Sequence, residues 1–282
     1  MWGYIVAGVV TGLFIALLML LFVFSFSPTI ASLIDPVVVS FLKDVVGPVS
    51  AGFGGAVAGA YAAFYFQQKS QKDKEFQDSA RTLSLAKLHY VQMLNDLTSI
   101  KKTSFLPYSA HEARFTIITY LPDSPLTEQP LDMKLIDMLM AQKAGEAINN
   151  VLLAAKKYEA CFDNFKSRNR AYDDYRAVVN AAHTGKGFKT SLIELCRVVE
   201  PGRMMALFNN TEDLISYVDE TIVFIANTIE EVGDILDPQF KERGVSIINI
   251  GAPPEIEMEP IAKPFFTEET LEEFLRQVRP EL

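Results

Sequence analysis

Residues 4–26 contain no charged side chain, and this run constrains most strongly what the chain can fold into. About 20 apolar residues in a helix cross the hydrocarbon core of a bilayer, so the run predicts a transmembrane helix. A second apolar run, from about Val45 to Phe66, predicts a second span. Residues 1–3 lack the basic side chains of a secretory signal peptide, which argues against cleavage. We therefore expect residues 1–66 to form a transmembrane hairpin, with the lipid bilayer as its first partner.

The distribution of basic residues predicts the orientation of this hairpin. Lysine and arginine are enriched at the cytoplasmic ends of membrane spans. Residues 27–44, between the spans, hold one lysine, whereas four basic residues follow the second span: Lys69, Lys72, Lys74 and Arg81. We expect a two-pass protein of the bacterial inner (plasma) membrane with both termini in the cytoplasm. Asp35-Pro36 predicts the start of a short helix between the two spans.

Small residues recur four positions apart in the predicted spans, which places them in rows on a helix face. Membrane helices gain stability from close backbone contact between small residues, because lipid tails are as apolar as leucine. The predicted packing residues are Gly8, Gly12, Gly47, Ala51, Gly55, Gly59 and Ala63. The second span has more small rows than one partner needs, so we favour a homo-oligomer over packing within the hairpin alone. Whether such an oligomer forms a pore stays open.

Residues 67–238 predict a cytoplasmic helical bundle or coiled-coil domain. An apolar stripe continues from the second span without a breaker and predicts one long helix: Leu83, Ala86, Tyr90, Met93, Leu97 and Ile100. Four prolines make residues 104–130 irregular, and Phe115–Tyr120 predicts a short strand there. Leu131–Asn180 predicts a long helix with at most one break. Arg168 interrupts its apolar face, and we favour a side chain that reaches solvent over one that fixes register.

A second apolar stripe has strict heptad spacing and is called the seam here. Its members are Ile215, Val218, Ile222, Ile225, Ile229, Val232 and Leu236. Thr211 is the predicted N-cap of this helix, and residues 245–250 predict a short strand. Residues 239–282 predict a proline-rich linker and a short acidic helix capped by Thr267. This last helix either packs on its own bundle, which we favour, or binds a partner's groove.

Charge and motifs argue against several classes of function. The net charge of −9 does not suit direct nucleic-acid binding, which usually needs a basic face. Cys161 and Cys196 lie beside apolar neighbours and predict buried free thiols. The three histidines lack zinc-site spacing, and residues 185–190 lack the spacing of a phosphate-binding loop. We therefore predict no catalytic residue, no metal and no cofactor, and a protein that is not an enzyme.

One segment carries a resemblance. Residues 156–169, Lys-Lys-Tyr-Glu-Ala-Cys-Phe-Asp-Asn-Phe-Lys-Ser-Arg-Asn, form a helix pattern with a central tyrosine and a final Arg-Asn pair. This pattern resembles one in uncharacterised bacterial two-span membrane proteins, and the architecture resembles the membrane effectors of antiviral systems, including those paired with retrons. The resemblance implies a membrane-disrupting, toxin-like effector whose cytoplasmic helices sense a protein partner. A passive membrane-anchored scaffold for a cytoplasmic complex is the alternative.

Overall fold

The computed structural model describes residues 12, 15, 19, 36–41, 44–45, 47–126, 133–182, 191–248 and 258–279. The chain divides into two compact units, Met1–Phe76 and Gln77–Leu282. Helices and irregular segments make up the described ranges, in which no strand occurs, so the fold is all-α. Most of the predicted first span, including Gly8, lies outside the described residues, and the two-helix hairpin stays a prediction.

The first unit contains the short helix α3 (Pro36–Phe41) and the beginning of α4 (Gly47–Ile100). Proline stands at the first position of α3, as the sequence predicts, because its fixed φ suits a helix start. Helix α4 begins a continuous helical stretch, Gly47–Tyr108, that is long and apolar enough to cross a membrane. None of its most apolar window is buried against protein, which is typical of a surface that faces lipid. The predicted long helix is confirmed.

The second unit contains the rest of α4 and the helices that follow it. A π-helical turn, η2 (Lys101–Phe105), and a 3-10 turn, η3 (Leu106–Tyr108), close α4 where Pro107 ends the regular hydrogen bonding. The remaining helices are α5 (Arg114–Ile117), α6 (Met133–Ala141), α7 (Gly145–Ala182), α8 (Leu192–Val198), α9 (Pro201–Lys241) and α11 (Glu268–Val278).

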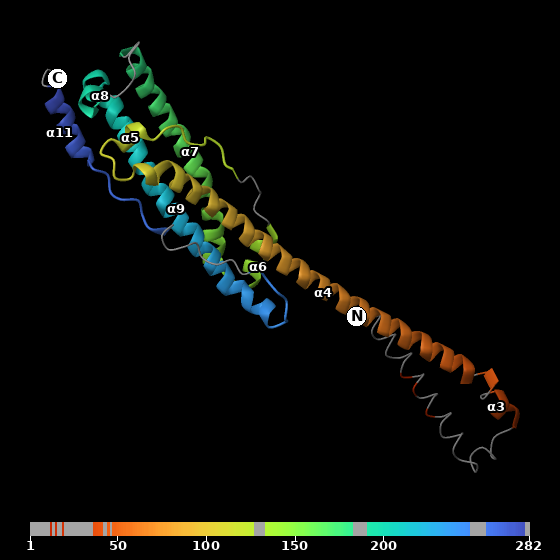
Figure 1. Cartoon of the computed structure of the whole chain (residues 1–282). Coiled ribbons are helices and arrows are strands. Elements are labelled where there is room, and N and C mark those ends of the chain that lie inside the picture. Colours follow the sequence, from red (N-terminus) through yellow and green to blue (C-terminus); the bar gives the residue numbers. More distant parts are fainter. Residues whose placement is uncertain are drawn as a thin grey trace. The chain divides into compact units, whose positions relative to one another are not determined.

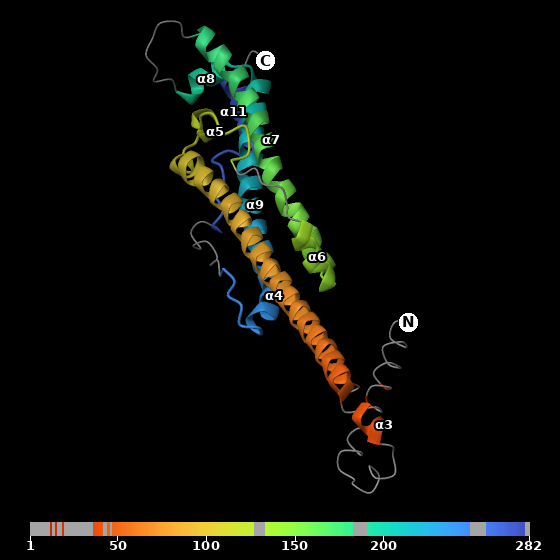
Figure 2. The same ribbon diagram turned by 90° about the vertical axis from the view of Figure 1, so that its right-hand side faces the viewer.

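Helices α7 and α9 lie side by side and make the most extensive contact in the unit (Figures 1 and 2). They are antiparallel, because Asn150 near the start of α7 bonds Glu231 near the end of α9. The predicted stripe of α4 is buried against them at all six positions. Two tyrosine hydroxyls tie α4 to α7, one from Tyr90 to the carbonyl of Val151 and one from Tyr158 to Asp96.

Several local predictions are wrong. Residues 114–117 form helix α5 where a strand is predicted, and residues 245–248 are irregular. Thr211 is no N-cap: α9 begins ten residues earlier at Pro201, and the buried Thr211 hydroxyl donates to the carbonyl of Leu207. The predicted single break in the long helix is confirmed, since residues 142–144 separate α6 from α7.

A C-terminal arm, defined here as residues 258–279, packs on the second unit. Helix α11 carries the predicted Thr267 cap, in which Thr267 and Thr270 bond reciprocally. Its apolar face joins a cluster built by α7, α8 and α9, in which Leu271 and Leu275 are buried. The acidic helix therefore docks on its own bundle. Of the described residues of the predicted linker, 258–264, Ile261 is buried and most of the others are exposed.

Candidate functional site

The predicted membrane-packing row lies open in the described part of the chain. A Cβ atom built on Gly12, Gly55 or Gly59 would meet no neighbouring atom within 4 Å. The side chains of Ala51 and Ala63 on the same row are exposed, and Gly47 is half-buried. The row is thus a surface without a described partner, and the predicted homo-oligomer stays a prediction.

Among the described residues of the second unit, Arg168 is the most deeply buried charge, with no exposed surface. Its guanidinium donates to the carbonyl oxygens of Thr119 at 2.7 Å, Phe115 at 3.2 Å and Ile118, and to the Thr211 hydroxyl at 3.3 Å. The prediction that Arg168 reaches solvent is wrong. The chain after α5 crosses α7 at this position and supplies backbone oxygens that replace water around the cation.

Two further features support the Arg168 charge. Its guanidinium lies 4.6 Å from the ring centre of Tyr172, within cation–π range. Burial lowers the pKa of Arg168 to about 10, which still leaves the side chain protonated at neutral pH. The adjacent Asn169 bonds both backbone groups of Leu121, donating to its carbonyl at 2.8 Å and accepting its N–H at 3.1 Å. Arg168 and Asn169 together therefore hold residues 115–121 against α7.

Two buried ion pairs, Lys101–Asp219 and Arg114–Glu212, also bind backbone groups of the C-terminal arm, and we call them the junction. Lys101, just past the end of α4, places its ammonium 2.7 Å from Asp219 Oδ1 and donates to the carbonyl of Glu259 at 2.6 Å. The other carboxylate oxygen of Asp219 accepts the backbone N–H of Ile261 at 2.7 Å. The end of α4, the middle of α9 and the arm meet at this pair.

Arg114 makes the second pair of the junction. Its guanidinium binds Glu212 through Nε at 2.9 Å and through Nη2, in a two-pronged arrangement. The third nitrogen donates to the carbonyls of Ala262 at 2.7 Å and Ser109 at 3.0 Å. Glu212 and Asp219 are seven residues apart and so lie on one face of α9. Sequence reasoning missed the junction because its partners are more than 90 residues apart.

A third ion pair, Lys87–Asp237, joins α4 to α9 nearer the C-terminal end of α9. The ammonium of Lys87 lies 2.6 and 2.8 Å from the two carboxylate oxygens of Asp237. Gly233 makes room for it, since a Cβ atom there would stand 3.2 Å from that ammonium. Lys87 pairs with the end of α9 and Lys101 with its middle, so α4 and α9 are antiparallel.

The seam lies inside the second unit. Ile215, Val218, Ile222, Ile225, Val232 and Leu236 are buried, while Ile229 is partly exposed. Polar residues of the same face are buried with them, including Thr211, Asp219 and Thr228. The seam therefore serves the bundle core, and its one partly open position is Ile229.

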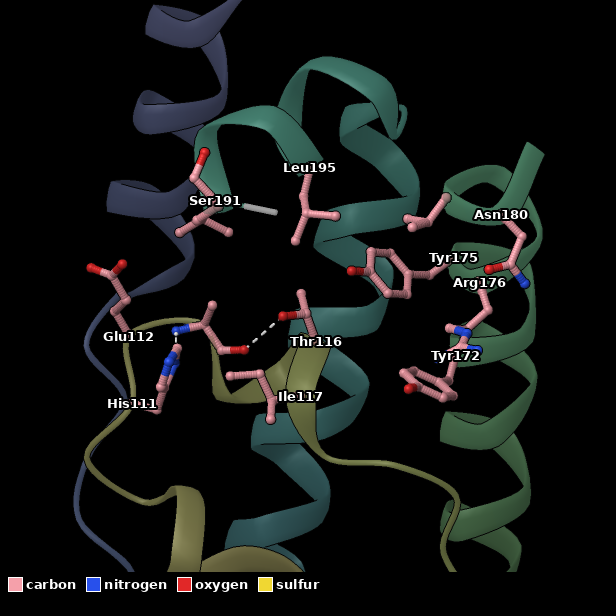
Figure 3. Close-up of a pocket in the computed structure, with 13 residues that line it drawn as sticks. His111, Glu112, Thr116, Ile117, Tyr172, Tyr175, Arg176, Asn180, Ser191 and Leu195 are labelled. Atoms are coloured by element: carbon pink, nitrogen blue, oxygen red, sulfur yellow. Dashed lines mark hydrogen bonds between the residues drawn. The ribbon is translucent and has the colours of Figure 1, made fainter. Parts of the chain in front are cut away.

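A cavity of about 600 Å³ opens between α5, the end of α7 and the start of α8 (Figure 3). Ala113, Tyr172 and Leu195 are among the buried side chains that line it. The exposed residues of the lining include His111, Glu112, Arg176, Asn180 and Ser191. A cavity of this size and mixed lining suits a small polar molecule.

Two polar residues of this cavity, His111 and Ser191, already take part in local hydrogen bonds. His111 accepts the N–H of Ala113 at Nδ1, at 3.1 Å, which leaves only its other ring nitrogen for a ligand. The Ser191 hydroxyl caps α8 by accepting the N–H of Glu194 at 3.3 Å. Burial raises the pKa of the Tyr175 hydroxyl to about 12, so this group is a neutral donor. None of the hydrogen bonds described for this cavity joins a nucleophile to a base.

The cysteines are both free and buried, as predicted. Burial raises the pKa of the Cys161 thiol to about 12 and that of the Cys196 thiol to about 11. Within the described ranges, no group of three or more His, Cys, Asp and Glu side chains is placed to hold a metal ion. Comparisons of the chain with models of protein families, with curated proteins and with solved structures gave no match.

Proposed function

We propose that this chain is a non-enzymatic effector or signalling protein of the bacterial inner membrane. Its cytoplasmic helical domain would bind a protein partner, and its two spans would respond by altering the membrane. The observation that carries the proposal is α4, a single helix of 54 residues. Its beginning is apolar and exposed, and its end supplies core residues such as Leu83 and Leu97.

The continuity of α4 favours a responsive anchor over a passive one. A passive tether needs no regular structure between the membrane and the domain, whereas a continuous helix transmits rotation and displacement along its axis. The end of α4 is also tied to other elements by the buried lysines Lys87 and Lys101. Removal of one partner from a buried ion pair is strongly destabilising. A partner that shifts α9 or the arm would therefore act on α4 directly.

The topology of the proposed membrane protein is tested with reporter fusions. A reporter that is active only outside the cytoplasm, fused at residue 35, should be active, and the same reporter fused after residue 75 should be silent. The reason is the cluster of lysines that follows Phe66. A reporter that is active only in the cytoplasm should give the reverse pattern. Cytoplasmic activity at residue 35 contradicts the two-pass arrangement.

Substitutions in the small-residue row of the second span distinguish a membrane effector from a passive scaffold. Glycine in a helix interior costs about 0.5–1 kcal/mol relative to alanine, so its repeated use favours close helix contact. We expect Gly55→Leu and Gly59→Leu to abolish crosslinked oligomers and any membrane depolarisation on overexpression, at normal protein levels. Phe53→Leu, off this row, is the matched control and should change neither. Unaltered crosslinking in both glycine variants would leave a passive anchor as the better description.

A further inference from the structure

The cavity of about 600 Å³ between α5, α7 and α8 combines a buried apolar lining with an exposed polar one. Ala113, Val179 and Leu195 are among its buried apolar side chains. The hydroxyl groups of Tyr175 and Thr116, which are also buried, lie beside each other in the lining. Such a cavity accepts a ligand with an apolar body and a polar end that stays near water.

Helix α7 contributes a cation and an amide to the exposed lining. Tyr172, Arg176 and Asn180 are spaced four residues apart, so they lie along one face of α7. Among the described residues, the Arg176 guanidinium contacts the ring of Tyr172, 5.8 Å from its centre, and pairs with no carboxylate. The side-chain amide of Asn180 likewise makes no hydrogen bond to a described residue. Both side chains therefore keep N–H donors for a ligand.

The segment before α5 supplies the other side of the cavity. His111 and Glu112 lie across the cavity from Arg176 and Asn180 (Figure 3). Nδ1 of His111 accepts the N–H of Ala113, so the proton of the neutral ring is on Nε2, which is a donor. Glu112 is exposed, and water and salt screen its charge. The charge that meets a ligand beside α7 is therefore positive.

We propose that this cavity binds a small organic anion. Its carboxylate or phosphate group pairs with Arg176 and Asn180, and its apolar body lies against the buried Val179 and Leu195. The planar fork of a guanidinium binds either anionic group through two hydrogen bonds. The volume of the cavity falls within the range of about 300–1,000 Å³ typical of small-molecule sites. The site lies within the second unit, so the proposal is independent of the membrane role.

A ligand in this cavity would act on the junction. It contacts α5, α7 and α8 together, and α5 begins at Arg114, which forms the junction ion pair with Glu212. A ligand that binds only the folded unit stabilises that unit in proportion to the logarithm of its concentration. Occupation of the cavity therefore stabilises α5 and, with it, the junction.

The test measures the binding of three matched probes to the detergent-purified full-length chain by fluorine NMR. The probes are 6-fluoro-2-naphthoate, 6-fluoro-2-naphthyl phosphate and the neutral 6-fluoro-2-naphthamide. We expect saturable binding of at least one anion, about tenfold tighter than that of the amide, because charge-assisted hydrogen bonds are the stronger ones. The tighter of the two anions distinguishes a carboxylate ligand from a phosphate ester. That anion should also raise the melting temperature of the second unit.

Three variants make the outcome decisive. Arg176→Met should weaken binding of the anions about tenfold or more and leave amide binding unchanged. Arg170→Met, exposed on α7 outside the cavity, is the matched control and should keep the affinity. Leu192→Trp, at a partly exposed lining position, should block all three probes by filling the cavity.

Circular dichroism checks that each variant stays folded, as expected for positions at least partly exposed to solvent. Equal anion binding by Arg176→Met and Arg170→Met overturns the proposal. Saturable binding of neither anion, or anion binding that survives Leu192→Trp, overturns it as well.

Discussion

Ile222→Asp is expected to unfold the second unit, Gln77–Leu282. Ile222 has no exposed surface and lies at the centre of the seam. The substitution removes a buried aliphatic group and places a carboxylate where no basic partner is described, and each change alone costs several kcal/mol. We expect a loss of about 5 kcal/mol, comparable with the whole stability of many domains. Circular dichroism of the detergent-purified chain should show the cooperative transition of this domain lowered or lost.

The matched control for this prediction is Ser216→Asp. Ser216 is exposed on the same helix, two turns earlier, and should change stability by less than about 0.5 kcal/mol. If Ile222→Asp melts like the parent chain, the seam is not a core in solution. Ile229→Asp should fall between these two variants, because Ile229 is only partly exposed.

Arg168→Met should produce the second largest effect. Methionine removes the donors that satisfy three backbone carbonyl oxygens, two of them in buried hydrogen bonds, and hydrogen bonds to a charged group contribute about 1.5–3 kcal/mol each. Part of this loss is offset because the desolvation of the guanidinium is no longer required, so we expect about 3 kcal/mol. Hydrogen exchange should show the amides of residues 115–121 exchanging faster than those of α9.

Two comparisons make the Arg168 prediction specific. Arg170→Met changes the same residue type two positions on, at an exposed site, and should have little effect. Arg168→Lys keeps the charge but loses the planar fork, so it should fall between the other two variants. Equal stability of Arg168→Met and Arg170→Met would show that the carbonyl cage contributes nothing to folding.

The sequence supported the helical parts of the fold because their patterns are local. The stripe from Leu83 to Ile100 and the Thr267 cap each depend on residues within a few turns of one helix. The strand predicted at Phe115–Tyr120 failed for the opposite reason. Its β-branched and aromatic side chains suit a strand. The carbonyl oxygens of this segment instead accept hydrogen bonds from Arg168, which lies on helix α7 about 50 residues away in the sequence.

The junction could not be predicted for a related reason. Lys101 and Arg114 resemble ordinary surface cations in the sequence, and Asp219 lies beside the seam without a nearby basic neighbour. Only the folded chain brings the arm over them, and each cation then divides its donors between a carboxylate and a backbone carbonyl. Helix α9 starts ten residues before the predicted cap at Thr211, because Pro201, whose fixed φ suits a helix start, is its first residue.

The cage around Arg168 has a consequence for how this protein can vary. Three of its four oxygen ligands are backbone carbonyls, so exchanging the side chain at 118 or 119 leaves these oxygens in place. No acidic residue needs to change together with the arginine, because the guanidinium donates to three carbonyl oxygens and one hydroxyl. Chains of this kind should therefore keep arginine at 168 while the exposed residue at 119 varies, and pairwise covariation would overlook the contact.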